Sequence, residues 1–91
     1  MSITHDTTQR RFVLALGGCE AVLDYAVLDA ATVDFHHTFV PDGLRGRSVG
    51  TQLVRHALDW AREEGYRVVP SCWFVSAVAR RHPEYTALLV A

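Results

Sequence analysis

The chain contains no lysine, which limits the chemistry it can perform and the partners it can attract. Its nine basic residues are all arginines. A lysine Schiff base and a lysine general base are therefore excluded. Ten acidic residues balance the arginines, and the formal net charge is −1 at pH 7. This balance gives no electrostatic reason to expect a nucleic acid or an anionic membrane as a partner.

Cysteine is scarce, and long apolar runs are missing. Cys19 and Cys72 are far apart, and no apolar segment of secretory type stands near the N-terminus. We therefore expect a reducing cytoplasm and no disulfide. No apolar run approaches the ~20 residues that cross a bilayer, so no membrane partner is expected. With 91 residues and a hydrophobic fraction of 49%, the chain is expected to form a single domain, residues 1–91, with one modest core.

Alternating apolar residues predict strands over residues 11–16, 19–28 and 32–40, the first two joined by a Gly17-Gly18 turn. Residues 1–9 show no periodicity and are predicted to form a loose tail or the approach to a first strand. If the strand over 32–40 is regular, four of its side chains share one face: Val33, Phe35, His37 and Phe39. His36 then lies on the opposite face from His37, which argues against a zinc site built on this pair.

The second half of the chain is predicted to be mainly helical. Apolar residues at helical spacing predict a helix over 48–64, with Gly65 just past its C-terminus. A short strand over 67–70 and a helix over 74–81 follow, and residues 86–90 form a last strand or a closing turn. The strand–helix–strand unit predicts a right-handed crossover between parallel strands. The expected fold is therefore α/β (α+β), with a mostly antiparallel sheet, one βαβ crossover and the order β-β-β-α-β-α.

A glycine- and arginine-rich loop precedes the helix over 48–64. It contains Gly43, Gly46 and Gly50, interspersed with Arg45 and Arg47. Glycines let backbone N–H groups approach a ligand, a helix N-terminus attracts anions, and arginines bind phosphate oxygens. The loop is neither a P-loop nor a G-x-G-x-x-G turn. It predicts a diphosphate site for a carried cofactor, although the same pattern also occurs as a plain turn before an amphipathic helix.

The expected crossover brings other residues to this loop. Ligands of open α/β sheets lie beyond the carboxyl ends of parallel strands, beside a helix N-terminus. Val40 and Cys72 follow the two strands expected to be parallel. Both are therefore expected at the same rim as residues 46–50.

The loop resembles a known cofactor motif. Arg45-Gly46-Arg47-Ser48-Val49-Gly50 is similar to the acyl-CoA pyrophosphate motif of the GNAT N-acetyltransferases, R/Q-x-x-G-x-G/A. Arg45 and Gly50 match it, whereas Ser48 stands where the family usually has glycine. A serine there can still donate its backbone N–H and cap the helix, and it is unfavourable only if the position needs a positive φ.

Other segments between residues 10 and 85 resemble the small single-domain GNAT family of YjdJ type. They are His37-Thr38-Phe39-Val40-Pro41, Leu53-Val54, Ala57-Leu58, Ala61-Arg62, Gly65, Val69-Pro70-x-Cys72-x-Phe74-Val75 and His82-Pro83-Glu84-Tyr85. The resemblance implies a minimal acetyltransferase core that binds acetyl-CoA or CoA. The backbone of Phe39 and Val40 would pair with the pantetheine arm as an extra strand does, and residues 45–50 would hold the diphosphate.

Three side chains are candidates for catalytic roles. Cys72 lies between a strand end and a helix start, where a helix N-terminus lowers the pKa of a thiol. It could accept an acyl group, form a mixed disulfide with CoA or only line the pocket, and the resembled family has a cysteine at this position. His37, or His36, is a candidate general base for an amine. Tyr85 would protonate the leaving CoA thiolate, as tyrosines do in many GNAT enzymes, unless it belongs to a purely structural turn.

The expected function is therefore acetyl-CoA-dependent N-acetyl transfer to an unidentified amine. Direct attack by the amine, the norm in the superfamily, is favoured over a route through Cys72. The rival interpretation is a CoA-binding module with little or no turnover, because so short a chain leaves little protein for an acceptor site. An interaction domain that binds no nucleotide is a further alternative. The protein would act as a monomer, or as a homodimer that completes the acceptor groove, and no metal is expected.

Overall fold

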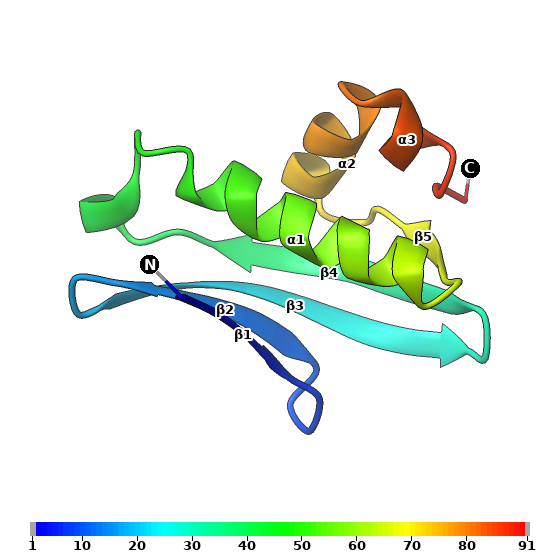
Figure 1. Ribbon diagram of the computed structural model, residues 1–91, viewed down its shortest axis with the longest axis horizontal. Coiled ribbons are helices and arrows are strands. Elements are labelled where there is room, and N and C mark those ends of the chain that lie inside the picture. Colours follow the sequence, from blue (N-terminus) through cyan, green and yellow to red (C-terminus); the bar gives the residue numbers. More distant parts are fainter. Residues whose placement is uncertain (1, 91) are drawn as a thin grey trace.

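The computed structural model describes residues 2–90 as one five-stranded sheet with its helices on one face (Figure 1). The elements, in chain order, are β1 (Ser2–Asp6), β2 (Arg11–Leu16), β3 (Cys19–Asp29), β4 (Thr32–Phe39), the 3-10 turn η1 (Asp42–Leu44), α1 (Val49–Glu63), β5 (Arg67–Val69), α2 (Trp73–Arg80) and α3 (Pro83–Thr86). The spatial order of the strands follows the chain, with antiparallel pairing from β1 to β4 and parallel pairing of β4 with β5. The predicted mixed fold with one βαβ crossover is confirmed.

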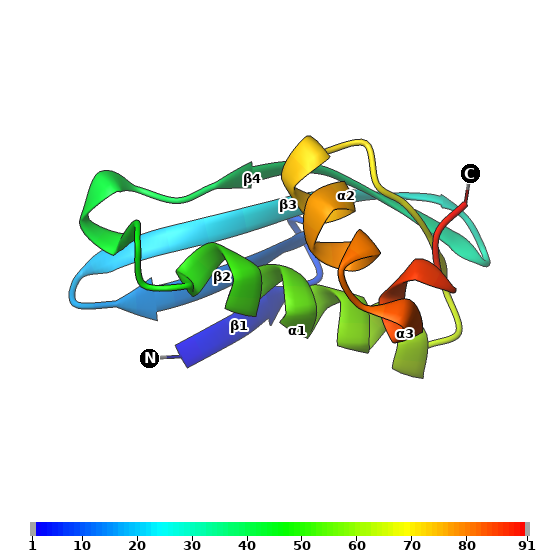
Figure 2. The same cartoon turned by 90° about the horizontal axis from the view of Figure 1, so that it is seen from above.

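The core lies between the sheet and α1. On the sheet, alternate residues of β2, β3 and β4 are fully buried, which includes Phe12, Leu14, Leu23, Val33 and Phe35. On α1, the buried residues recur at intervals of one helical turn, namely Leu53, Val54, Ala57, Leu58 and Ala61. Each fully buried Leu or Phe side chain contributes about 1.5–3 kcal/mol of transfer free energy. This burial fixes which face of α1 meets the sheet, and Figure 2 shows the three helices lying over that sheet face.

The N-terminus corrects the sequence-based prediction. Residues 2–6 form the edge strand β1, paired antiparallel with β2, and not a loose tail. The sequence of β1 does not show a clear alternation of apolar and polar residues, because the side chains on its inner face are Ile3 and the polar His5. His5 stacks on Phe12 with ring centroids 4.1 Å apart, and its Nε2 lies 2.6 Å from the Tyr25 hydroxyl. A histidine ring thus takes the place of an apolar side chain and attaches β1 to the core.

A β-bulge in β4 corrects the predicted alternation of that strand. Asp24 of β3 pairs with His37, whereas the next residue, Tyr25, pairs with Phe35, so His36 is the extra residue. A bulge of this kind shifts the phase of the side chains that follow it. Thr38, opposite the buried Leu23, now faces the helices, and His36 and His37 are both exposed. The prediction that His37 shares a face with Phe35 is therefore wrong.

The C-terminal segment closes the sheet beyond β5. Pro83 begins the single turn of α3, in the segment expected to form a turn. After it, Leu89 forms an isolated parallel bridge with Val68. The Val68 N–H donates to the Leu88 carbonyl at 2.9 Å, and the Val90 N–H donates to the Val68 carbonyl at 2.8 Å. Residues 88–90 therefore act as a minimal last strand.

Within residues 2–90, no helix combines the length and the apolar character needed to cross a membrane.

The end of α1 provides a test of the fold. Gly65 has φ +79°, and an added Cβ would meet no atom within 4 Å. The Gly65 N–H donates to the Arg62 carbonyl at 3.2 Å, and the Tyr66 N–H donates to the Ala61 carbonyl at 2.8 Å. The change Gly65→Ala therefore adds backbone strain without a clash, and we expect it to lower the free energy of unfolding by about 1 kcal/mol in urea denaturation. Glu64→Ala, one residue earlier at a right-handed helical position, should change it by less than about 0.5 kcal/mol. Equal effects of the two changes would contradict this account.

Candidate functional site

The pairing of β4 with β5 stops halfway along β4. The ladder joins Thr32–Asp34 to Arg67–Val69. One further backbone bond follows, from the Cys72 N–H to the Phe35 carbonyl at 3.0 Å. Beyond it the chain after β5 turns into α2, whereas β4 continues to Phe39. Within residues 2–90, the edge of β4 over residues 36–39 that faces α2 therefore has no partner strand.

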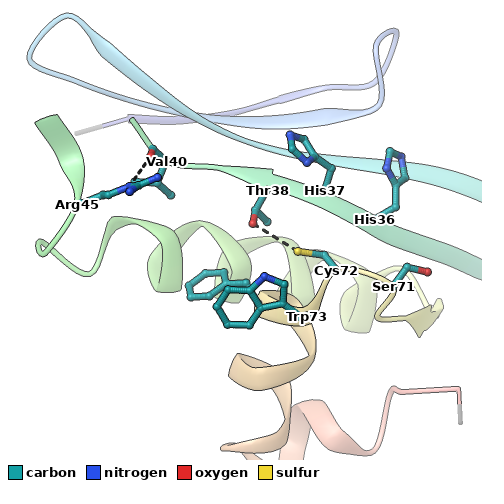
Figure 3. Close-up of a pocket in the computed structure, with 9 residues that line it drawn as sticks. His36, His37, Thr38, Val40, Arg45, Ser71, Cys72 and Trp73 are labelled. Carbon is teal, nitrogen blue, oxygen red and sulfur yellow. Dashed lines mark hydrogen bonds between the residues drawn. The ribbon is translucent and has the colours of Figure 1, made fainter. Parts of the chain in front are cut away.

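A groove of about 600 Å³ opens where the two strands part (Figure 3). Its lining residues come from β4, from the loop after it and from the start of α2: His36, His37, Thr38, Val40, Arg45, Ser71, Cys72, Trp73 and Phe74. Five of these were candidate site residues in the sequence-based prediction: His36, His37, Val40, Arg45 and Cys72. Phe39 does not line the groove with its side chain, since it pairs with Val22 on the sheet face away from the helices and is 51% exposed. Its contribution to the site is its backbone at the strand edge.

A second hollow, of about 240 Å³, lies at the N-terminus of α1. It is lined by Val40, Leu44, Arg45, Gly46, Ser48, Val49, Gly50, Thr51 and Phe74. The first backbone bond of α1 runs from the Gln52 N–H to the Ser48 carbonyl at 3.0 Å. The N–H groups of Val49, Gly50 and Thr51 therefore have no partner inside the helix, and the helix dipole makes this end positive. The hollow suits an anion, and it shares Val40, Arg45 and Phe74 with the groove.

Ser48 adopts a backbone conformation that usually belongs to glycine. Its φ is 58° and its ψ is 19°, in the left-handed region, and its side chain makes no capping hydrogen bond. The motif position thus does require a positive φ, and the helix cap expected from the serine hydroxyl is absent. A left-handed conformation costs a non-glycine residue about 1–2 kcal/mol. The chain keeps the backbone path of the motif in spite of the serine.

Gly50 is required for a different reason, which is space. A Cβ atom at this position would lie 3.0 Å from a ring carbon of Phe74 and 3.2 Å from Cγ2 of Val40. These two side chains belong to α2 and to the segment after β4, so Gly50 is the point at which both approach α1. Any larger residue would push Phe74 or Val40 towards the two hollows.

Cys72 is the residue directly before α2, its side chain makes no capping hydrogen bond, and it lines the groove. Its Sγ lies 3.5 Å from the Thr38 hydroxyl oxygen. Burial by itself would raise the pKa of the Cys72 thiol, but hydrogen bonds from the Thr38 hydroxyl and from the backbone of Val75, Phe74 and Thr38 outweigh this effect and lower the pKa. The thiolate form of Cys72 is therefore stabilised.

The two histidines lie together at the bulge. His36 and His37 are both exposed, both line the groove, and both project from the same side of β4 in Figure 3. The prediction that they point to opposite faces is wrong, because it assumed a strand without a bulge. Nonetheless, residues 2–90 contain no group of three or more His, Cys, Asp and Glu side chains that could hold a metal ion.

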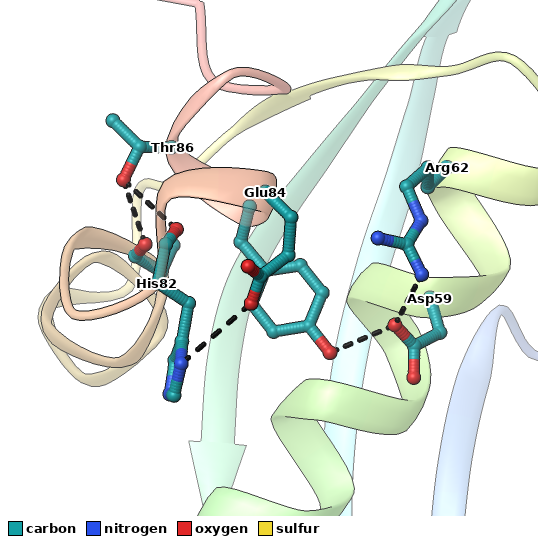
Figure 4. Close-up of polar contacts among 7 residues, drawn as sticks. Asp59, Arg62, His82, Glu84 and Thr86 are labelled. Carbon is teal, nitrogen blue, oxygen red and sulfur yellow. Dashed lines mark hydrogen bonds and ion pairs between the residues drawn. The ribbon is translucent and has the colours of Figure 1, made fainter.

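Tyr85 is not among the residues that line the groove. It belongs to α3, whose polar surroundings include the ion pair of Arg62 with Asp59 at 3.3 Å (Figure 4). Tyr85 is 2% exposed, and its hydroxyl donates a 2.7 Å hydrogen bond to Oδ1 of Asp59 on α1. The guanidinium carbons of Arg55 and Arg62 lie 5.9 and 5.8 Å from the centre of its ring. Its role as the group that protonates a leaving thiolate stays a prediction, which its position outside the groove lining does not favour. Tyr85 attaches α3 to α1.

Four groove residues were missed by the sequence-based prediction, namely Thr38, Ser71, Trp73 and Phe74. Thr38 was assigned to the wrong face because the bulge leaves no clear mark in the pattern of apolar residues. Trp73 and Phe74 follow Cys72 directly, so extending the expected rim by one turn of helix would have found them. Phe74 lines both hollows and meets Gly50.

Comparison with known proteins gives a consistent family assignment. A family model described as GCN5-related N-acetyl-transferase matches residues 11–88. Protein NATD1 from Bos taurus is 37% identical over 83 residues, which cover 89% of this chain and 74% of that protein. Protein NATD1 from Homo sapiens is 36% identical over 83 residues, with the same coverage of 89% and 74%. The solution structure of a GCN5-like candidate N-acetyltransferase from Staphylococcus aureus is similar with a TM-score of 0.76 and 23% identity, covering 99% of this chain and 88% of that one. At this identity the structural likeness supports the fold alone. The more specific YjdJ-type assignment stays a prediction.

The contact between Thr38 and Cys72 can be tested by the reactivity of the thiol. Thr38→Val removes the hydroxyl that stabilises the thiolate, so burial is less opposed and the pKa of Cys72 should rise. We expect the pH midpoint of Cys72 alkylation by iodoacetamide, followed by peptide mass spectrometry, to move upward. Thr38→Ser keeps a hydroxyl and should keep the midpoint near that of the unmodified chain. Cys19, read from the same digest, is the internal control. An unchanged Cys72 midpoint in Thr38→Val would show that the hydroxyl has no effect on the thiol.

Proposed function

Because the chain belongs to the GCN5-related N-acetyltransferase family, we propose that it binds acetyl-CoA in this groove and transfers the acetyl group to an amine. The observation that carries the proposal is the continuity of two hollows. One ends at unpaired N–H groups of a helix, and the other ends at a thiol and an unpaired strand edge. A long molecule with a diphosphate at one end and a thioester at the other matches this arrangement.

The loop before α1 would hold the diphosphate. The N–H groups of Val49, Gly50 and Thr51 point out of the first turn of α1, and Arg47 is exposed beside them. Backbone N–H groups at a helix N-terminus and an arginine are a suitable set of donors for phosphate oxygens. Arg45 has a second role, because its Nε donates to the Val40 carbonyl at 3.1 Å and thereby holds the loop against the end of β4.

The free edge of β4 would bind the pantetheine arm. Backbone groups at an unpaired strand edge can pair with the amides of an extended ligand. Phe39 and Val40 supply such groups between the diphosphate site and Cys72. The bulge before them ends the regular pattern of β4, so this edge leads from one hollow to the other.

The catalytic groups of the chain would act on an acetyl thioester, which acetyl-CoA supplies when bound. A backbone N–H near Val40 would donate to the thioester carbonyl and stabilise the charge that develops on its oxygen. His37, exposed at the bulge, would take the proton that the amine loses. We favour direct attack by the amine, with Cys72 as part of the groove wall.

The alternative is a CoA-binding module with little or no turnover. The titratable side chains that line the groove are two exposed histidines, one thiol and Arg45. Such a set can bind a ligand without providing a strong base. In either case we place the protein in the cytoplasm, where Cys19 and Cys72, both free thiols in the structure, stay reduced.

Calorimetry with CoA tests the binding site. We expect the purified chain to bind CoA, and Gly50→Ala to weaken binding about tenfold or more, because the added methyl group pushes Phe74 into the hollows. Gly43→Ala is the matched control, since its Cβ would meet only Cys19 Sγ, at an ordinary 3.6 Å. Thermal melting should confirm that both variants are folded. The proposal fails if the folded, unmodified chain shows no binding of CoA at millimolar concentration.

Replacement of Cys72 distinguishes the two chemical routes. Direct attack predicts that Cys72→Ala keeps its turnover number within about tenfold of the unmodified enzyme, because the thiol then makes no covalent bond. Release of CoA and formation of the acetylated amine would be measured together, with Cys19→Ala as the control. A loss of turnover by a factor of about a thousand or more, with an acetylated Cys72 peptide in the unmodified enzyme, would establish the route through the thiol instead.

A further inference from the structure

Trp73 is exposed at the wall of the groove. It is 77% exposed, more than the other exposed large hydrophobic residues of the described chain, Leu28 at 54%, Phe39 at 51% and Val90 at 37%. It is the first residue of α2, directly after Cys72, whereas Phe74 and Val75 pack towards the core. Its ring meets the edge of the Phe74 ring, with centroids 5.8 Å apart. The indole thus adds little to folding and offers a large apolar surface beside the thiol (Figure 3).

The groove provides no counter-charge for an ammonium group. Its lining residues include Arg45, His36 and His37, but no aspartate or glutamate. Asp42 pairs with Arg45 at 3.3 Å and Asp24 with Arg11 at 2.8 Å. Asp34 of β4 has a buried Oδ1 without a hydrogen-bond partner, but it does not line the groove. The Cys72 Sγ lies 3.5 Å from the Thr38 hydroxyl oxygen, so a thiolate there already has a hydrogen-bond donor. A polyamine or a lysine side chain would therefore enter without a partner for its charge.

The reacting nitrogen must nevertheless be neutral, because only its lone pair can attack a thioester. An alkylamine with a pKa near ~10.4 is almost entirely protonated at neutral pH and needs a strong base or a carboxylate to lose its proton. The groove lining supplies no carboxylate for this task. An amine on an aromatic ring is neutral under the same conditions, and its ring can stack on an indole.

We infer, on the basis of the proposed acetyltransferase function, that the acceptor is an aromatic amine whose ring stacks on Trp73. In the reaction, a bond forms between the amine nitrogen and the acetyl carbon, and the bond from that carbon to sulfur breaks. The sulfur leaves with the electron pair as the CoA thiolate. The proton lost by nitrogen passes to His36 or His37 and then to solvent, so the products are an N-acetylated aromatic amine and CoA.

The test compares aromatic with aliphatic amines on the full chain. Aniline and 4-aminobenzoate would be compared with spermidine and Nα-acetyl-lysine at saturating acetyl-CoA, by CoA release and by mass spectrometry of the product. We expect kcat/KM to be at least about tenfold higher for the aromatic amines. Trp73→Ala should raise KM for the aromatic amine about five- to tenfold and leave KM for acetyl-CoA unchanged, whereas Trp73→Phe should keep the lower KM. Leu28→Ala, an exposed apolar residue of β3 outside both hollows, is the control and should change neither constant.

Other outcomes overturn the inference and separate it from the proposed function. Better turnover of spermidine or Nα-acetyl-lysine leaves the acetyltransferase function intact but refutes an aromatic acceptor. A rise in KM for acetyl-CoA in Trp73→Ala would show that Trp73 contacts the cofactor and not the acceptor, which refutes the inference. Binding of CoA without acetyl transfer to any amine would refute the inference and support the CoA-binding module. If CoA does not bind at all, the proposed function itself fails.

Discussion

The separation of β4 from β5 determines the rest of the site. In a regular parallel pair the ladder would continue, and the backbone groups at this edge of β4 would all be hydrogen-bonded to β5. Here the last bond is the one from the Cys72 N–H to the Phe35 carbonyl. The bulge at His36 comes immediately after it and turns Thr38 towards Cys72. The end of the β4–β5 ladder therefore frees a strand edge, and the bulge in the β3–β4 ladder brings a hydroxyl to a thiol and exposes two histidines. The same short segment of β4 is responsible for all of these features.

The groove remains open because α2, which forms its other wall, is packed against α1. Phe74 of α2 meets Gly50 of α1 at a distance that excludes a Cβ atom, which brings α2 close to the helix N-terminus. At the far end, the hydrogen bond from Tyr85 to Asp59 holds α3, and through it α2, against α1. These contacts position α2 although it has only eight residues. In so small a domain, packing between helices replaces the additional layers that would otherwise support a site.

The parts of the fold that could be predicted are those with a regular period. The helix expected over 48–64 is observed as Val49–Glu63, and Gly65 ends it as expected. The bulge, β1 and the place of Tyr85 could not be predicted, each for a physical reason. One extra residue at His36 reverses the later alternation, and His5 packs as an aromatic ring where the pattern shows a polar residue. For the third, the partner of Tyr85 is 26 residues away in the sequence. Of the groove lining, Val40, Arg45 and Cys72 could be placed together from local sequence and topology, and Trp73 and Phe74 were within reach of the same reasoning. The place of Thr38 depends on the bulge, which the sequence does not reveal.

Ser48 and Gly50 show that one motif can be under two different constraints. Gly50 is constrained by the space around it, because a side chain at this position would disturb the groove. Ser48 is constrained by its positive φ angle, a conformation in which glycine would be less strained. The serine is held in its left-handed conformation by α1 on one side and, on the other, by the loop that Arg45 fastens to the Val40 carbonyl. A serine has fewer backbone conformations than a glycine, so the loop loses less entropy when an anion fixes its shape. The backbone strain at Ser48 is therefore compatible with anion binding. The strained residue lies in the short loop that would bind the anion, and a rigid loop loses less entropy on binding.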